Sequence, residues 1–309
     1  MRRRSNELEA AREAYAEELR GRCPLRSEAL VRALATVRRE DFLPRGPWLL
    51  LERLEGYSST PSTDPREIYR DVAVAIDAGR LLNSSQPSLL AAILDALDVA
   101  PGERVVHVGC ATGYYTAILA ELVGRAGAVT ALEIDPRIAA SAKRNLRAWK
   151  QVEVIHADAL EHDFGPADVV LVDAGVTQPH RRWLDALRPG GRMALPLTAI
   201  RPPTRVARFL RNNLGWFLFL RRESAGFSAR FGERAGIAAL YGGRDPERQA
   251  RLDATYRKGG RDRVRSLRLD PHPLDATCWF HDAEFCLSTR EVGLATPSQR
   301  LLDAERGGA

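Results

Sequence analysis

The chain has 309 residues, of which 45% are hydrophobic and 28% are charged, a balance that excludes a disordered chain and predicts a sizeable buried core. Its formal net charge is +6, but arginines stand among acidic residues along the whole chain, so the charge predicts a solvated surface and does not favour a nucleic-acid partner. The basic N-terminus lacks an apolar signal region and no run reaches about 18 apolar residues, which predicts a cytoplasmic protein with no membrane partner.

Strong helix formers dominate the first part of the chain. We expect two helices there, at residues 6–20 and 27–39. A loop rich in Ser, Thr and Pro, a short strand, and a turn that enters a helix are then expected at residues 56–65, 71–76 and 83–88. Pro87 lies in the first turn of that next helix, where its fixed φ angle is tolerated.

The middle of the chain alternates apolar strands with helices. The expected strands are residues 104–108, 128–133, 152–156, 169–172 and 192–197. The expected helices are residues 115–122, 136–149 and 181–187. Strands that alternate with helices in this way predict an α/β fold with a mostly parallel, doubly wound sheet.

Beyond residue 201 this alternation stops. The aromatic stretches GWFLFL at 215–220 and CWFHDAEFCL at 278–287 each predict a strand that could extend the sheet in antiparallel fashion. The charged stretch between them predicts a helix that is interrupted at Gly259-Gly260. The chain's four cysteines include no CxxC pair and no His-rich set of partners, so the sequence predicts neither a disulfide framework nor a metal site. Cys278 and Cys286 lie among aromatic residues, which favours core packing for both thiols.

A glycine-bearing turn follows the strand at residues 104–108 and opens a helix. Its sequence is Gly109-Cys110-Ala111-Thr112-Gly113-Tyr114, and such a turn lets a ligand approach the backbone at the C-terminal edge of a parallel sheet. Glu133 ends the next strand, where a carboxylate can accept hydrogen bonds from both ribose hydroxyls of an adenosine. The sequence therefore predicts an adenosine-binding unit, because a strand, a glycine turn, a helix, a second strand and an acidic residue follow one another at the expected spacing.

The same turn indicates which adenosine ligand fits. The third glycine of a GxGxxG sequence allows close packing beside a pyrophosphate, and the bulky Tyr114 stands in its place. No GxxxxGK[ST] sequence exists for a nucleoside triphosphate. S-adenosylmethionine, which carries no phosphate, is the cofactor that the sequence favours.

The segments VVHVGCATGYYTAILAELVG, VTALEID, Ala157-Asp158-Ala159 and LRPGGR resemble class I (Rossmann-like) methyltransferases in order and spacing. The resemblance implies that the glycine turn wraps the methionine and ribose part of S-adenosylmethionine, that Glu133 binds the ribose and that Asp158 faces the adenine. The full set of cofactor-binding residues expected is Gly109, Cys110, Ala111, Thr112, Gly113, Tyr114, Glu133, Ile134, Asp158, Ala159 and Asp173. His107 stands where an acidic residue often precedes the turn, which predicts a different or weaker hold on the methionine amino group.

Segments on both sides of the glycine turn indicate which family of class I methyltransferases the chain resembles. VRREDFLP, IYRDVAVAI and NSSQPSLLAAIL, with DVVLVDAGVTQPHRRWLDALRPGGRMALPL further on, resemble protein-L-isoaspartate O-methyltransferases over roughly residues 27–197. The resemblance places the active-site serine at Ser85, which would orient a substrate carboxylate, with Asn83, Ser84 and Gln86 holding an extended peptide. The competing interpretation is that Ser85 is a helix N-cap. Methyl transfer to a carboxylate needs alignment and exclusion of water, so no metal is expected.

The resemblance also implies an organisation in three regions. Residues 1–80 would form a helical region on the substrate side, 81–200 the cofactor-binding core, and 201–309 a C-terminal region that adds strands and a helical stretch. Because repair enzymes of this family resemble only the front of the chain, the added region keeps a dedicated peptide aspartate open beside L-isoaspartate in damaged proteins.

Two further functions stay open, an RNA methyltransferase and a catalytically inactive cofactor-binding protein. Against base-flipping adenine methylation, Ala174-Gly175-Val176 replaces the aromatic tetrapeptide that such enzymes use to stack the base. His180, beside Pro179, is a further candidate for the pocket rim, although a lone histidine is more often structural. The oligomeric state is not predicted.

Overall fold

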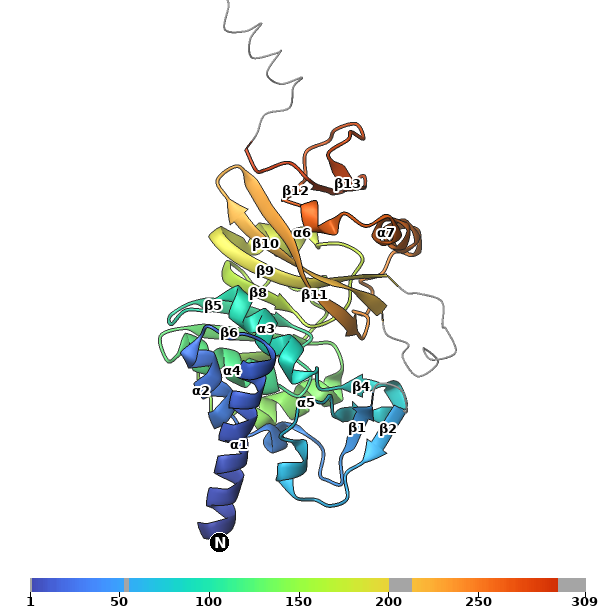
Figure 1. Cartoon of the computed structure of the whole chain (residues 1–309). Helices are drawn as coiled ribbons and strands as arrows, with labels where there is room; N and C mark the ends of the chain where they lie inside the picture. The colour runs from blue at the N-terminus through green and yellow to red at the C-terminus, as the bar shows by residue number, and fades with distance from the viewer. Residues whose placement is uncertain (1, 53–55, 200–212, 294–309) are drawn as a thin grey trace, which may run out of the picture.

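The computed structural model describes residues 2–52, 56–199 and 213–293. A sheet of ten strands runs through the molecule in the order β13-β14-β12-β11-β10-β9-β8-β5-β6-β7 (Figure 1). In chain order its strands are β5 (Arg104–Val108), β6 (Ala128–Glu133), β7 (Val152–His156), β8 (Ala167–Val172), β9 (Leu187–Ala199), β10 (Asn213–Glu223), β11 (Gly226–Ile237), β12 (Ser266–Arg268), β13 (Cys278–His281) and β14 (Cys286–Ser288).

The strands β5 to β9 form the parallel half of the sheet, which confirms the predicted doubly wound core. β5, β6 and β7 have the predicted bounds, and β5 pairs in parallel with both β6 and β8. β9 starts at Leu187, five residues before the predicted strand, because the GGR segment is taken into the strand as an irregularity: Gly190 has a φ of 77°, and the register with β8 shifts between Leu187 and Arg192.

Side chains of these strands alternate between two cores. Val169 and Leu171 belong to the core under α1 to α5, whereas Val170 and Val172 belong to the core under α6 and α7. The helices are α1 (Arg2–Arg22), α2 (Glu28–Thr36), α3 (Pro87–Leu97), α4 (Tyr114–Val123), α5 (Pro136–Asn145), α6 (Arg181–Ala186) and α7 (Pro246–Lys258). Both faces of the parallel half are thus buried, as its near-continuous apolar strands require.

The N-terminal region is less purely helical than predicted. The expected loop at residues 56–65 begins with β2 (Gly56–Ser59), which pairs antiparallel with β1 (Leu49–Glu52). The expected strand at 71–76 reduces to β3 (Ala75–Asp77), which pairs with β4 (Leu82–Asn83). Short 3-10 turns at Arg39–Phe42, Pro65–Ile68 and Ala78–Arg80 connect these pieces.

The C-terminal region continues the sheet with antiparallel strands. β10 pairs with β9 and then with β11, so this region shares the sheet of the core, and the three-region division remains a prediction. The single strand expected at 278–287 is two strands, β13 and β14, because a turn closes between them: the Asp282 amide donates to the Phe285 carbonyl and the Glu284 amide donates to the Asp282 carboxylate. The predicted charged helix is α7, which ends at Gly259.

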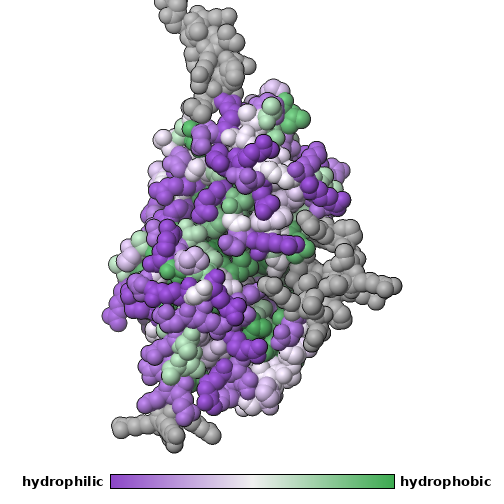
Figure 2. Space-filling view, in the orientation of Figure 1, coloured by the Kyte–Doolittle hydropathy of each residue, from purple (hydrophilic) through white to green (hydrophobic). Residues whose placement is uncertain are grey.

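Figure 2 shows hydrophilic side chains spread over one whole face, with smaller apolar areas between them. Within the described ranges, no helix combines the length and the apolar composition that crossing a membrane requires.

Candidate active site

A cleft of about 2020 Å³ opens at the carboxyl ends of β5, β6 and β8. The structure brings the predicted site residues together on its walls: Asn83, Ser84, Ser85, Gln86, Gly109, Cys110, Ala111, Thr112, Gly113, Tyr114, Glu133, Ile134, Asp158, Ala159 and Asp173. Parallel strands place their carboxyl ends at one edge of the sheet, which is why segments far apart in the chain meet here. His180 is different: its ring packs on Trp183 and lines a separate, shallow hollow, so its expected place at the rim of this cleft is wrong.

The glycine turn has the backbone that its sequence predicts. Gly109, Ala111 and Gly113 have φ angles of 76°, 49° and 99°, all in the left-handed region. A Cβ at Gly113 would lie 2.7 Å from a methyl carbon of Leu146, so a side chain is excluded there by space as well as by dihedral angle. The turn therefore presents backbone, rather than side chains, to the cleft.

Glu133 is bound to this turn. One carboxylate oxygen accepts from the Ala111 amide at 3.0 Å and the other from the Asp135 amide at 3.0 Å. Burial raises the pKa of Glu133, while these two amides oppose that shift. A carboxylate oxygen has more than one acceptor position, so both oxygens can still accept from two adjacent hydroxyl groups in the cleft.

The next positions on the same wall form a flat, partly apolar surface. Ile134 is 38% exposed, which is unusual for a large aliphatic residue and suits contact with a planar ring. Asp158 is half-buried, and one of its carboxylate oxygens accepts from the Leu160 amide at 2.9 Å. The Ala159 carbonyl accepts from the Trp183 indole, which fixes the edge of this surface.

His107 does not line the cleft. It is buried between β5 and α4, where Nδ1 lies 2.9 Å from the Thr116 hydroxyl, and burial lowers its pKa to about 3. The imidazole is therefore neutral at physiological pH. The side chain is directed into the helix–sheet core and is not part of the cleft lining, so the different or weaker hold on the methionine amino group stays a prediction.

Ser85 and Asp173 form a side-chain pair across the site. The Ser85 hydroxyl lies 3.1 Å and 3.0 Å from the two Asp173 carboxylate oxygens, although 88 residues separate them in the chain. Burial raises the pKa of Asp173 to about 7, while the Ser85 hydrogen bond opposes that shift. The Ser85 carbonyl accepts from the Tyr115 hydroxyl at 3.0 Å. Ser85 is not the N-cap of α3, because that position belongs to Gln86.

The neighbours of Ser85 are held by internal hydrogen bonds. The side-chain oxygen Oδ1 of Asn83 accepts from the Tyr57 hydroxyl, and the side-chain amide Nε2 of Gln86 donates to the Asp71 carboxylate at 3.1 Å. Ser84 is buried, and its hydroxyl accepts from the Val74 amide at 3.1 Å. These contacts position the segment, and Ser84 has its hydroxyl directed into the protein rather than toward a ligand.

Two charged residues that the sequence analysis did not single out hold this segment. Arg39 is fully buried and donates to the carbonyls of Ile68 and Val72 at 2.6 Å and to the Ser84 hydroxyl at 3.2 Å. Asp71 accepts from the Ser88 amide at 2.8 Å, at the first turn of α3. Both lie inside the VRREDFLP and IYRDVAVAI segments, where each stands next to another charged residue, so the sequence carried no signal for its buried role.

The C-terminal region supplies another wall. Residues 233–242 line the cleft, and the segment after β11 is tied to the core where the Gly175 amide donates to the Ala238 carbonyl at 2.7 Å and the Leu240 amide donates to the Gly175 carbonyl at 2.9 Å. Tyr241, at the rim, is 73% exposed. Nothing in the local sequence pattern of residues 233–242 predicted this wall.

These walls fit S-adenosylmethionine. Asp173 is a mostly buried carboxylate that faces the cleft beside a neutral hydroxyl, and such a group favours a cationic ligand over a phosphate. Glu133 and Asp158 add further negative charge along the same walls, and the glycine turn contributes backbone for close approach.

Comparisons with known proteins found related sequences and folds. The family model described as protein-L-isoaspartate(D-aspartate) O-methyltransferase matches residues 10–215. Protein-L-isoaspartate O-methyltransferase 1 of Archaeoglobus fulgidus is 32% identical over 195 residues, which cover 62% of this chain and 81% of that protein. The Methanopyrus kandleri protein-L-isoaspartate O-methyltransferase is 31% identical over 192 residues, covering 60% and 76%.

Solved structures share the fold. A protein-L-isoaspartate O-methyltransferase superposes with a TM-score of 0.58 at 23% identity, covering 80% of this chain and 69% of the other. A Plasmodium falciparum protein described as a protein-L-isoaspartate O-methyltransferase, in complex with S-adenosyl-L-homocysteine, gives 0.55 at 17% identity, covering 74% and 97%.

Proposed function

Because the chain belongs to the protein-L-isoaspartate(D-aspartate) O-methyltransferase family and depends on S-adenosylmethionine, we propose that it methylates the free carboxylate of L-isoaspartate in proteins or peptides. The observation that carries the proposal is the Ser85–Asp173 pair, which stands in the cleft beside the glycine turn. A cytoplasmic location is part of the proposal, and the four unpaired cysteines suit a reducing compartment.

Different residues of the cleft contact different parts of the cofactor. When bound, S-adenosylmethionine supplies a methyl group on a positively charged sulfur. The glycine turn, Glu133 and Asp158 hold the adenosine part, and Asp173 balances the positive charge. The remaining cofactor contacts that we propose are Cys110, Thr112, Tyr114, Ile134 and Ala159.

Ser85 orients the acceptor. Its hydroxyl donates to Asp173 in this structure, and a cationic group beside Asp173 weakens that bond and leaves the hydroxyl to donate to an acceptor carboxylate. The acceptor is already an anion, so alignment at the methyl group and exclusion of water suffice, and no base is needed. Asn83 and Gln86 border the acceptor position, while Ser84 holds the segment in place.

One observation favours a second acceptor. Residues 233–242 line the cleft, although they lie beyond the stretch that the family model matches. A wall of this kind would suit an aspartate in one dedicated peptide as well as isoaspartate in many proteins.

The test is a transfer assay with labelled S-adenosylmethionine and matched peptides that contain either isoaspartate or aspartate. We expect base-labile label on the isoaspartate peptide, and a loss of turnover on the order of 100-fold in Ser85→Ala with cofactor affinity retained. Label on the aspartate peptide alone would contradict isoaspartate methylation and support methylation of aspartate in a dedicated peptide. Absence of label on both peptides, despite cofactor binding, would reject carboxyl methylation, and label transferred to RNA instead would identify the RNA alternative.

A further inference from the structure

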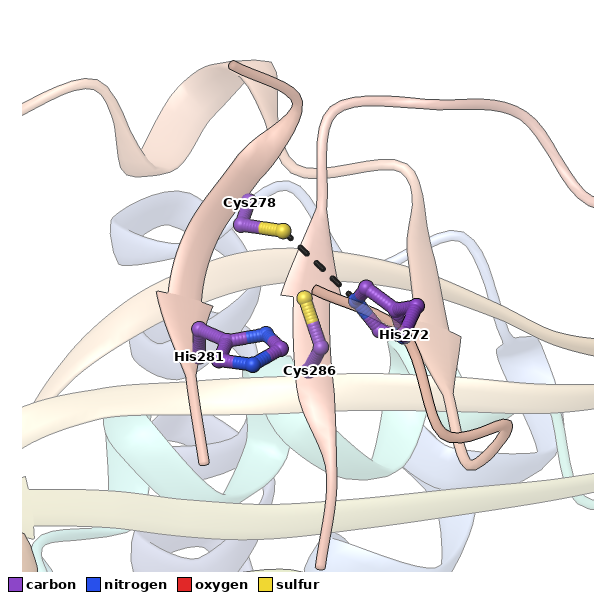
Figure 3. A group of neighbouring side chains, drawn as sticks. All are labelled: His272, Cys278, His281 and Cys286. Atoms are coloured by element: carbon purple, nitrogen blue, oxygen red, sulfur yellow. Dashed lines mark hydrogen bonds between the residues drawn. The ribbon is translucent and has the colours of Figure 1, made fainter. Parts of the chain in front are cut away.

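Four potential metal ligands converge at the outer end of the sheet, far along the chain from the cleft residues. They are His272, Cys278, His281 and Cys286, which come from the loop after β12, from β13 and from β14 (Figure 3). One ligand atom from each lies within 4.8 Å of the other three. Cys278 and Cys286 are both unpaired.

One distance within the cluster already matches a tetrahedral zinc site. For zinc bonds of about 2.3 Å to sulfur and about 2.1 Å to nitrogen, the sulfur–nitrogen edge of a tetrahedron is roughly 3.6 Å. The Cys278 sulfur lies 3.6 Å from His272 Nε2. An ion can therefore be shared by these atoms with small adjustments of the remaining side chains.

Strand register explains why the ligands face one another. His281 and Cys286 are direct partners across the antiparallel pair β13–β14, so their side chains point to the same face. Phe280 and Leu287, one position along, point to the opposite face and are buried in the core. The apolar residues thus do the packing that the sequence assigned to the cysteines, and the cysteine side chains are free for another role.

Neighbouring groups form hydrogen bonds with two of the proposed ligands, His272 and Cys278. His272 Nδ1 lies 2.7 Å from the Asp270 carbonyl, which fixes the tautomer that leaves Nε2 with a lone pair facing Cys278. The Asp275 amide lies 3.4 Å from the Cys278 sulfur as a donor, although an Asp275 carboxylate oxygen, 3.5 Å from the same sulfur, accepts from the thiol.

Two further observations indicate an ion. Nδ1 of His281 is buried and makes no hydrogen bond within the described part of the chain, which is costly for a polar atom. Arg268, the strand partner of Cys286, forms ion pairs with both Asp270 and Asp275, so these charged groups beside the cluster carry more negative than positive charge, which favours a cation.

We propose that these four residues bind one structural Zn²⁺ ion. Two sulfur and two imidazole ligands in a tetrahedral arrangement are typical of zinc, and four protein ligands leave no open position for substrate. The expectation that the cysteines only pack in the core, with no metal in the protein, is replaced by this proposal. The C-x2-H-x4-C spacing, with a histidine six residues upstream, was the missed signal.

The ion would stabilise strands that are too short to be stable alone. β12, β13 and β14 have only three or four residues each. Trp279, beside Cys278, packs against Phe231 and Tyr256, and the Tyr256 hydroxyl donates to the Leu197 carbonyl of β9. The zinc site therefore anchors the layer that supports the C-terminal wall of the cleft.

The experiment measures metal content in the full-length chain, purified without chelating resin from zinc-supplemented cells. We expect about one zinc per chain, with two sulfur and two nitrogen neighbours by X-ray absorption. The double variant Cys278→Ser/Cys286→Ser should fall below about one tenth of that content, because two of the four ligands are lost. Cys23→Ser and His162→Ala, which lie outside the cluster, should keep the full content.

A second measurement uses the unaltered chain, so its result does not depend on whether the double variant folds. Chelation should lower the melting temperature, and Zn²⁺ but not Mg²⁺ should restore it. The proposal would be overturned by unaltered chain that neither carries zinc nor takes it up, by zinc retained in the double variant, or by a Cys278–Cys286 disulfide in folded, metal-free protein.

Discussion

The two halves of the sheet are stabilised by different kinds of interaction. The parallel half, β5 to β9, is buried on both faces by helices, and its strands consist largely of Val, Leu and Ala. In the outer part, β12 to β14 are short, and buried ion pairs, aromatic contacts and the proposed zinc site hold them against α7. The comparison teaches that apolar burial on both faces builds the half that binds the cofactor. In the outer part, apolar residues such as Phe280 and Leu287 are buried on one face only, and polar contacts together with the proposed zinc site complete the attachment.

The largest effect on cofactor binding is expected from breaking the glycine turn. Gly113→Ala would place a Cβ 2.7 Å from Leu146 at a φ of 99°, and we expect cofactor affinity to fall on the order of 10- to 100-fold. Gly259→Ala is the matched control in the outer half, because its φ is 78° but nothing lies within 4 Å of the added carbon. Calorimetric titration should show normal affinity in that control. Equal losses in both variants would mean that cofactor binding does not depend on this turn specifically.

The outer half should respond most to the loss of a buried ion pair. Arg248 donates to Asp282 at 2.9 Å, and both side chains are buried, so Arg248→Met should cost about 3 kcal/mol of unfolding free energy. Arg181→Met, which removes an exposed pair with Asp185, should cost less than about 0.5 kcal/mol. Chemical denaturation measures both.

The same pair predicts a pH dependence. Burial alone raises the pKa of Asp282, but hydrogen bonds from Arg248 and Arg251 dominate and lower it to about 2. Since the folded pKa lies below the usual value of 3.8, this stabilisation is present above about pH 4 and is lost as the pH falls toward 2. The difference between Arg248→Met and the unaltered chain should shrink over that range, and a constant difference would contradict the assignment.

The parallel half should show its own pH signature, through Asp173. Its pKa is raised to about 7, so the unliganded carboxyl is largely protonated below pH 7, whereas a cationic cofactor favours the ionised form. Cofactor affinity should therefore weaken as pH falls below 7, by at most about tenfold per unit. Titrations between pH 5.5 and 8.5 measure this slope. Asp173→Asn should bind more weakly and flatten the slope, and an unchanged slope would assign the titration to another group.

The smallest effect is expected where the two halves meet. Tyr241 is 73% exposed at the rim, so Tyr241→Ala should raise the KM for the peptide a few-fold and leave cofactor affinity unchanged. Leu274→Ala removes another large exposed residue, 72% exposed and outside the cleft lining, and should change neither quantity. An unchanged KM in Tyr241→Ala would remove this rim residue from substrate binding.

Most of the core and of the cofactor wall could be predicted from the sequence. Gly109, Gly113 and Glu133 belong to one continuous strand–turn–helix–strand unit, where local dihedral preferences and apolar periodicity specify the geometry. Ser85 was found through the resemblance of its segment to a family. Arg39 and Asp71 were missed because their roles depend on carbonyls and amides that only folding brings near.

The sequence by itself determined the parallel core, the glycine turn and the class of cofactor, because each is encoded within a few consecutive residues. Only the tertiary structure decided that Asp173 meets Ser85, that residues 233–242 close one side of the cleft, and that two histidines and two cysteines converge beyond it. Those contacts join segments that are far apart in the chain, and local sequence does not determine how such segments lie relative to one another. Their relative positions are decided only when the whole sheet packs.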